Sequence, residues 1–119
     1  MKKLTLILTL IVSTVICSSP SFAEWTKVSK NVDGTTFYAD FERIRKHGGY
    51  VYYWSLTDRL KPSKHGILSD KIYNQGDCKL FRLKGMSFSY HKRPMGEGTG
   101  IVDNRPDKEW RYLSPNSAF

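Results

Sequence analysis

This sequence lacks helical periodicity, and it also lacks the common catalytic signatures. After residue 23, no apolar pattern of helical period extends over ten or more residues. No Gly-x-Ser-x-Gly elbow of a serine hydrolase occurs. The glycine-rich stretch 95–100 lacks the Lys-Ser/Thr pair and the following helix that a phosphate-binding loop needs, so a hairpin connection with positive φ angles is expected there. We therefore predict a protein that is not an enzyme and binds no nucleotide.

Metal ligands are also scarce. His47, His65 and His91 are isolated in the sequence, and beyond residue 23 the only cysteine is Cys78. Structural zinc sites use four cysteine or histidine ligands at characteristic spacings, which this sequence does not supply. Cys78 and the distant His91 could form a nucleophile–base pair, but no thiol-protease signature flanks the cysteine. We expect no metal, no cofactor and no catalytic residues.

The N-terminus has the features of a secretory signal peptide. Two lysines precede an apolar run over 4–16, and residues 21–23 (Ser-Phe-Ala) form a small-x-small cleavage site. The run has 13 residues, fewer than the roughly 18–20 of a membrane-spanning helix. Ile16 is too large for the position before a lipoprotein cysteine, so Cys17 is not expected to carry lipid. We predict a signal peptide helix over 1–23, cleavage after Ala23, and export to the periplasm or surface of a Gram-negative bacterium.

The mature chain, residues 24–119, has the length of one domain and a basic balance. Without Lys2 and Lys3, 17 of the 19 basic residues remain against 11 acidic ones, a net charge of +6. In an exported protein, this charge favours a partner protein, an anionic glycan or lipopolysaccharide over nucleic acid. The candidate polyanion or partner surface comprises six residues: Lys61, Lys64, Lys71, Lys79, Arg82 and Lys84. The alternative is a solvated sheet face whose charges discourage edge pairing.

Alternation of apolar and polar residues predicts a mainly β fold with a single antiparallel, hairpin-rich sheet of about five to six strands. The strands are expected over 24–30, 35–40, 50–59, 67–74, 78–90 and 110–113. A turn over 75–77 would join the fourth strand to the fifth. In the fifth strand, Phe81 and Leu83 have the opposite parity to Met86 and Phe88, which predicts a bulge near Gly85.

One short helical turn is expected over 41–46. Asp40 is a candidate N-cap, and Gly48 is a candidate stop.

Large aromatic residues are frequent for a chain of this size. Six of them could form a sugar-stacking platform: Trp25, Tyr52, Trp54, Phe88, Tyr90 and Trp110. In a small β domain such residues more often fill the core. We therefore expect them, and Trp54 above all, to be core residues.

An ordered set of landmarks resembles the surface-adhesin protein E family of small exported bacterial proteins. The landmarks are Trp25, Tyr38-Ala39-Asp40 with Ile44, Trp54, Ser69, Asp77-Cys78, Tyr90, Met95-Gly96-x-Gly98, Trp110 and Pro115-x-Ser117. The resemblance implies an α+β domain at the family level, in which helix flanks an antiparallel sheet. It also implies no catalytic activity and a role in binding host matrix and serum proteins such as vitronectin and laminin.

The resemblance also bears on Cys78. Family members continue past Pro-x-Ser into a C-terminal helix whose cysteine resembles the partner of Cys78, whereas this sequence ends at Phe119. Cys78 is therefore expected to be an unpaired thiol, behaving as a small apolar side chain on a strand at the sheet's rim. The alternative is a bridge between two chains in a homodimer.

Two functions are thus expected. The first is an exported, non-enzymatic binding protein, an adhesin-like protein that contacts host or matrix proteins. The alternative is a periplasmic accessory or inhibitor protein that docks another envelope protein or a polyanion.

Overall fold

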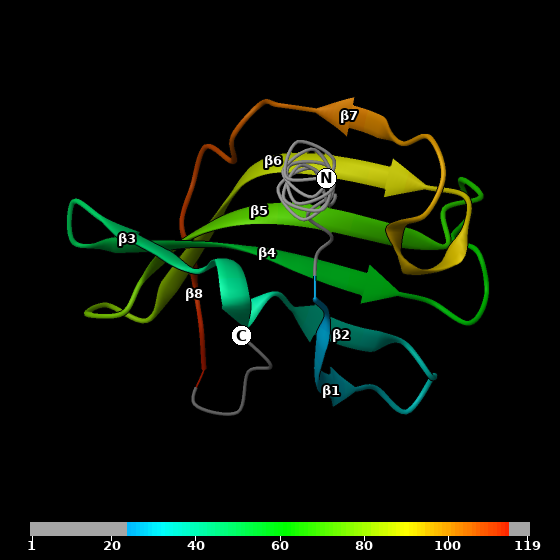
Figure 1. The fold of residues 1–119 in the computed structure, drawn as a ribbon, viewed down its shortest axis with the longest axis horizontal. Coiled ribbons are helices and arrows are strands. Elements are labelled where there is room, and N and C mark those ends of the chain that lie inside the picture. Colours follow the sequence, from blue (N-terminus) through cyan, green and yellow to red (C-terminus); the bar gives the residue numbers. More distant parts are fainter. Residues whose placement is uncertain (1–23, 115–119) are drawn as a thin grey trace, which may run out of the picture.

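The computed structural model describes residues 24–114, which form an open, eight-stranded antiparallel sheet (Figure 1). The elements are β1 (Thr26–Lys30), β2 (Thr36–Ala39), η1 (Phe41–Arg43), β3 (Arg45–His47), β4 (Tyr50–Asp58), β5 (Ser69–Asp77), β6 (Arg82–His91), η2 (Pro94–Gly96), β7 (Ile101–Asp103) and β8 (Arg111–Tyr112). The main path is β1-β2-β4-β5-β6-β7, while β3 pairs with β4 and β8 with β6. The expected signal peptide and the Pro115-x-Ser117 landmark lie outside the described residues.

The predicted mainly β, antiparallel fold is confirmed, but the sheet has eight strands rather than five to six. The additional strands are β3 and β7, each only three residues long. Strands this short carry too little alternation to be separated from turns in a sequence. Among the described residues, no helix is long and apolar enough to cross a membrane.

The expected helical turn over 41–46 is wrong beyond Arg43. Residues 41–43 form one 3₁₀ turn without a side-chain cap from Asp40, and the chain then enters β3. Gly48 does not stop a helix. Gly48 and Gly49, with φ angles of 59° and 84°, form the two-residue turn between β3 and β4. Such a turn needs positive φ at both central positions, which glycine adopts at little cost.

The expected turn over 75–77 is also wrong, because β5 continues through Asp77 and the chain turns at residues 78–81. The Asp77 carboxylate organises this turn by accepting hydrogen bonds from the backbone N–H groups of Lys79 and Leu80 and from the Arg82 side chain. Burial opposes ionisation of Asp77, yet these hydrogen bonds lower its pKa below the ordinary value. These side-chain hydrogen bonds hold the turn at residues 78–81.

The bulge predicted near Gly85 is confirmed. Tyr73 pairs with Ser87 while Asn74 pairs with Gly85, so Met86 is the extra residue on β6. The bulge turns Leu83 and Phe88 toward the same face although their parities differ.

The expected hairpin connection at 95–100 is also confirmed. Met95, Gly96 and Gly98 have positive φ angles, and β7 pairs back onto β6. The connection is anchored to the sheet because Met95 N–H donates to Asp58, and Gly96 N–H donates to Ser69.

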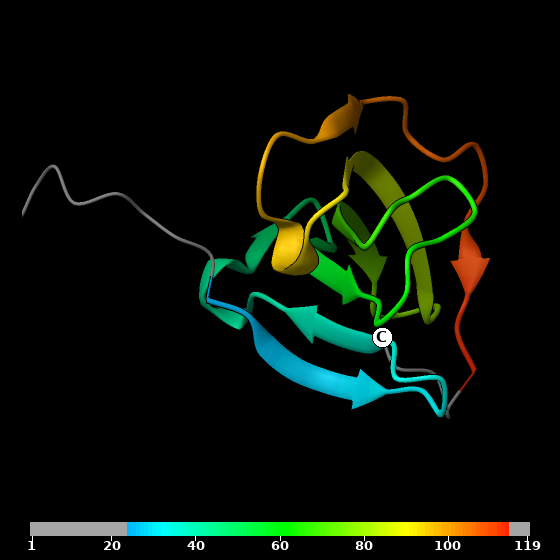
Figure 2. The ribbon, with the colours of Figure 1, turned by 90° about the vertical axis from the view of Figure 1, so that its right-hand side faces the viewer.

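The hydrophobic core is small. Figure 2 shows a strongly curved sheet with β1 and β7 at its two edges. Among the described residues, only Ala39, Leu56 and Leu83 are buried hydrophobic residues. The six aromatic residues expected in the core are all half-buried, Trp54 included. That expectation is wrong, because one curved sheet has no second layer to cover its faces over this part of the chain.

Candidate binding surfaces

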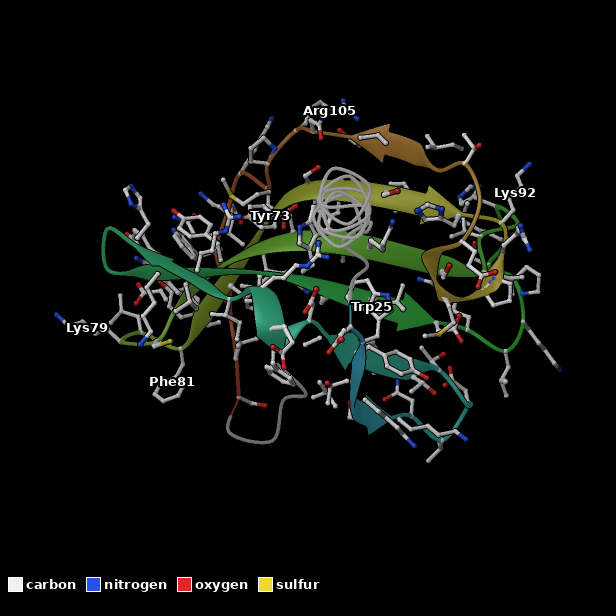
Figure 3. All side chains as sticks on the ribbon, viewed as in Figure 1. Trp25, Tyr73, Lys79, Phe81, Lys92 and Arg105 are labelled. Carbon is white, nitrogen blue, oxygen red and sulfur yellow. The ribbon has the colours of Figure 1, made fainter. Side chains whose placement is uncertain are left out.

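The six basic residues predicted to form one surface do not lie together. Lys61 and Lys64 lie in the β4–β5 loop at one end of the sheet, and Lys79 lies in the β5–β6 turn at the other. The nine residues of β5 separate these ends by roughly 26 Å. Figure 3 shows the same separation between Lys79 and Lys92, which follows β6. The predicted single patch is therefore wrong.

Lys71 lies between the two ends, on β5. Its aliphatic stem packs closely against Gly96 of η2, where an added Cβ would lie 3.0 Å from Lys71 Cδ. This side chain therefore supports the η2 connection.

Arg82 and Lys84, the last two of the six, gather around Trp110. The Arg82 guanidinium lies 4.3 Å and the Lys84 ammonium 5.1 Å from the centroid of the Trp110 ring. Tyr50 stacks on Trp110 at 5.7 Å between centroids. Arg82 also pairs with Asp77 at 2.9 Å, which raises the pKa of Arg82. The cluster fixes the segment that leads into β8 against the sheet.

A row of aromatic rings follows on the same face. Across β4 and β5, the centroid of Tyr73 lies 5.1 Å from that of Trp54 and 6.1 Å from that of Tyr52, and Tyr73 lies over the middle of β5 (Figure 3). Three basic residues of β3, Arg45, Lys46 and His47, complete a hollow of about 450 Å³ with Tyr52 and Tyr73. We call this the cationic hollow. Sequence reasoning missed its basic residues because it assigned 41–46 to a helix; the Gly-Gly pair that follows was the available signal.

The opposite face carries an apolar groove, formed by two hollows of about 410 and 330 Å³ that share Val51, Tyr53 and Cys78. We call these together the apolar groove. The larger hollow is also lined by Val28, Ala39, Phe41, Ile44 and Lys46, and the smaller by Gly76, Asp77, Phe81, Arg82, Leu83, Leu113 and Ser114. Val51 and Tyr53 alternate with Tyr50 and Tyr52 along β4, so the groove and the aromatic row lie on opposite faces.

Tyr53 is half-buried in the wall of the groove. Burial raises the pKa of Tyr53 to about 12, with a smaller opposing effect from Arg111. The phenol therefore stays neutral at physiological pH and serves as part of the groove wall.

Cys78 does not lie on a strand, as expected, but in the β5–β6 turn. The thiol is free, and the residue is exposed. The expectation of a small apolar residue on a strand is therefore wrong, because the strand expected from residue 78 begins only at Arg82, while β5 ends at Asp77. The alternative of a bridge between chains remains a prediction.

The histidines are dispersed in the described part of the chain. His47 lies on β3, His65 in the β4–β5 loop, and His91 at the end of β6. His91 is buried and contacts Ser89 Oγ through Nε2 and the Gly98 carbonyl through Nδ1. Within residues 24–114, no three His, Cys, Asp or Glu side chains could hold a metal ion together.

The molecule is thus a small β domain that exposes both faces of an open sheet, and each face carries shallow hollows. The chain belongs to the surface-adhesin protein E family, since that family's model matches residues 25–119. This confirms the resemblance noted in the sequence. The family is a surface-adhesin family and not an enzyme family, and membership indicates an exported protein. No curated protein sequence matches the chain.

Solved structures of Haemophilus influenzae protein E share the fold. Crystal form II has a TM-score of 0.60 at 16% sequence identity, with 84% of each chain covered. The selenomethionine form has a TM-score of 0.59 at 18% identity, covering 84% of this chain and 82% of the other. Protein E from a non-typeable strain has a TM-score of 0.55 at 16% identity, covering 83% and 71%. At these identities, the likeness concerns the fold.

Proposed function

We propose that this protein is an exported, non-enzymatic adhesin-like protein that contacts host or matrix proteins at the cell surface through the apolar groove. The observation that carries the proposal is the groove itself, which leaves large apolar side chains in water on one face of the sheet. Phe41 is 53% exposed at one end and Phe81 is 70% exposed at the other. Contiguous exposed apolar patches typically mark protein interaction sites.

Energetics favour a protein as the occupant of the groove. Burying one side chain of this kind stabilises a complex by about 1.5–3 kcal/mol. Aromatic residues seated in pockets are typical anchors of protein interfaces, and the groove offers Phe41, Tyr53 and Phe81. Membership of a surface-adhesin family supports a partner outside the cell.

The test uses the mature chain, residues 24–119, and measures binding to immobilised vitronectin and laminin, the host proteins that the family resemblance implies. Phe41→Ser should weaken binding by about tenfold, which corresponds to about 1.4 kcal/mol. Val32→Ser is the matched control, because Val32 is fully exposed in the β1–β2 turn, away from the groove. Circular dichroism checks that both variants fold. Absence of binding, or equal losses in both variants, would contradict the proposal.

A periplasmic accessory role is the second candidate, and the sheet edge favours it. β7 ends the main path of the sheet, and its Ile101 and Val102 are 64% and 62% exposed. An exposed edge can accept a strand from another protein. Here Ile101→Asp should abolish capture of an envelope protein while Phe41→Ser leaves it intact. Protease treatment of whole cells decides between the two locations, since only a surface protein is cleaved.

A further inference from the structure

We propose that the face opposite the apolar groove holds a second binding site, which takes an anionic polysaccharide carrying sulfate or carboxylate groups. The site consists of the cationic hollow and the cross-strand rows beside it. It differs from the predicted basic patch, because only Arg82 and Lys84 of those six residues belong to it.

Strand register assembles the first row of the site. Arg45 pairs with Tyr52, Tyr52 with Gln75, and Gln75 with Lys84, so four side chains of β3, β4, β5 and β6 lie side by side. Residues paired in this way point to the same face of a sheet. With strands about 4.8 Å apart, the row extends over roughly 14 Å from Arg45 to Lys84. A cation therefore stands at each end, with a phenol and an amide between them.

A second row runs beside the first. His47 pairs with Tyr50, Tyr50 stacks on Trp110, and the guanidinium of Arg82 lies over the same indole. This row also begins at a basic residue of β3 and ends at a cation of β6, with aromatic rings between. Together the two rows form a track that crosses the strands.

The charge of the cationic hollow selects an anion. Its lining contains no acidic residue, and Arg45 and His47 share the face of the tyrosines with which they pair. Lys46 pairs with Val51 and also lines the larger hollow of the groove, so its side chain belongs to the opposite face. Arg45, Lys46 and His47 are exposed. Opposite charge attracts a polyanion over a distance of about 8–10 Å at physiological ionic strength. Asp77 lies beside Arg82 on this face and forms an ion pair with it at 2.9 Å, so Arg82 offers an anion less charge than Arg45 or Lys84 does.

The chemistry between the cations favours a sugar chain over an acidic peptide. Strands β4 and β5 are paired on both sides, so their backbone has no free edge for an extended peptide to pair with. The track instead offers half-buried aromatic rings and the hydrogen-bonded pair of Tyr52 hydroxyl and Gln75 amide, 3.0 Å apart. The apolar C–H faces of sugar rings pack on aromatic rings. Sugar hydroxyls form hydrogen bonds with phenol and amide groups.

The experiment titrates the mature chain with heparin, hyaluronan and poly-glutamate at two salt concentrations. Arg45→Ser/Lys84→Ser removes both ends of the first row, and Lys61→Ser/Lys64→Ser is the control that removes the same charge elsewhere. The first pair should weaken heparin binding by about tenfold, because polyanion affinity follows the number of neutralised charges. The control should change it less than about twofold. Tyr52→Leu should weaken it as well, without a change in charge.

The outcomes separate the possibilities. Heparin binding alone indicates a sulfated ligand, and binding of both polysaccharides indicates that carboxylate suffices; either supports the proposal. Tighter binding of poly-glutamate, equal losses in both double variants, or no heparin binding would overturn it. Phe41→Ser should leave heparin binding unchanged. The test of the polysaccharide site can therefore succeed or fail independently of the test of the apolar groove.

Discussion

Replacing Gly85 with alanine tests the geometry of the β6 bulge. A Cβ at Gly85 would lie 2.5 Å from Cζ and 2.8 Å from Cε1 of Phe88, and 3.0 Å from Asp107 Oδ2. The Phe88 ring is rigid and stacks on Tyr90 with 6.4 Å between centroids, so it cannot yield as a flexible side chain would. Gly85 also exchanges two hydrogen bonds with Asp107, of 2.9 and 2.8 Å.

The expected cost follows from these contacts. Overpacking of this kind costs about 1–3 kcal/mol, and a hydrogen bond lost as the backbone shifts costs about 0.5–1.5 kcal/mol. We therefore expect Gly85→Ala to lower the free energy of unfolding by about 2–4 kcal/mol. In a domain of this size, each kcal/mol lowers Tm by about 4–8 °C. Urea unfolding followed by circular dichroism measures the loss.

The ring can be shown to be the cause with a double-mutant cycle. Phe88→Leu removes the aromatic atoms that the new Cβ would meet. In that background, Gly85→Ala should cost less than about 1 kcal/mol, because a glycine without positive φ normally gains stability from alanine. Equal costs in both backgrounds, or a single variant as stable as the wild type, would refute the reasoning.

Two further predictions concern the β5–β6 turn. Asp77→Asn should lower the free energy of unfolding at pH 7, and the gap between variant and wild type should shrink near pH 3. The pKa of Asp77 is lowered in the folded state. The ionised carboxylate therefore stabilises the fold above about pH 4, and this stabilisation is lost as the pH falls through the pKa of the folded state. Urea midpoints at the two pH values measure this, and a difference independent of pH would contradict it. Cys78, being exposed, should react with a thiol reagent in the native protein as completely as in urea, and Cys78→Ser should give no label. A disulfide-linked dimer on a non-reducing gel, absent from Cys78→Ser, would confirm the expected bridge between chains.

Sequence alone determined the fold class and most long strands of this protein, because alternation is a local property of a strand. Five observed strands, β1, β2, β4, β6 and β8, lie within the ranges expected for them to within one residue. The parity conflict between Leu83 and Phe88 was enough to place the bulge beside Gly85. The family could also be recognised from the sequence, because its landmark residues occur in the same order along the whole chain.

Only the tertiary structure decided which residues share a surface. Lys61 and Lys79 belong to loops at opposite ends of β5, a separation that distance along the sequence does not reveal. The cationic hollow depends on the turn at Gly48-Gly49, which folds β3 back onto β4 and brings Arg45 beside Tyr52. Trp54 is only half-buried because no second layer covers the sheet over residues 24–114. Periodicity sets the direction of each side chain, but strand pairing and curvature set its neighbours, because these come from contacts between segments far apart in the chain.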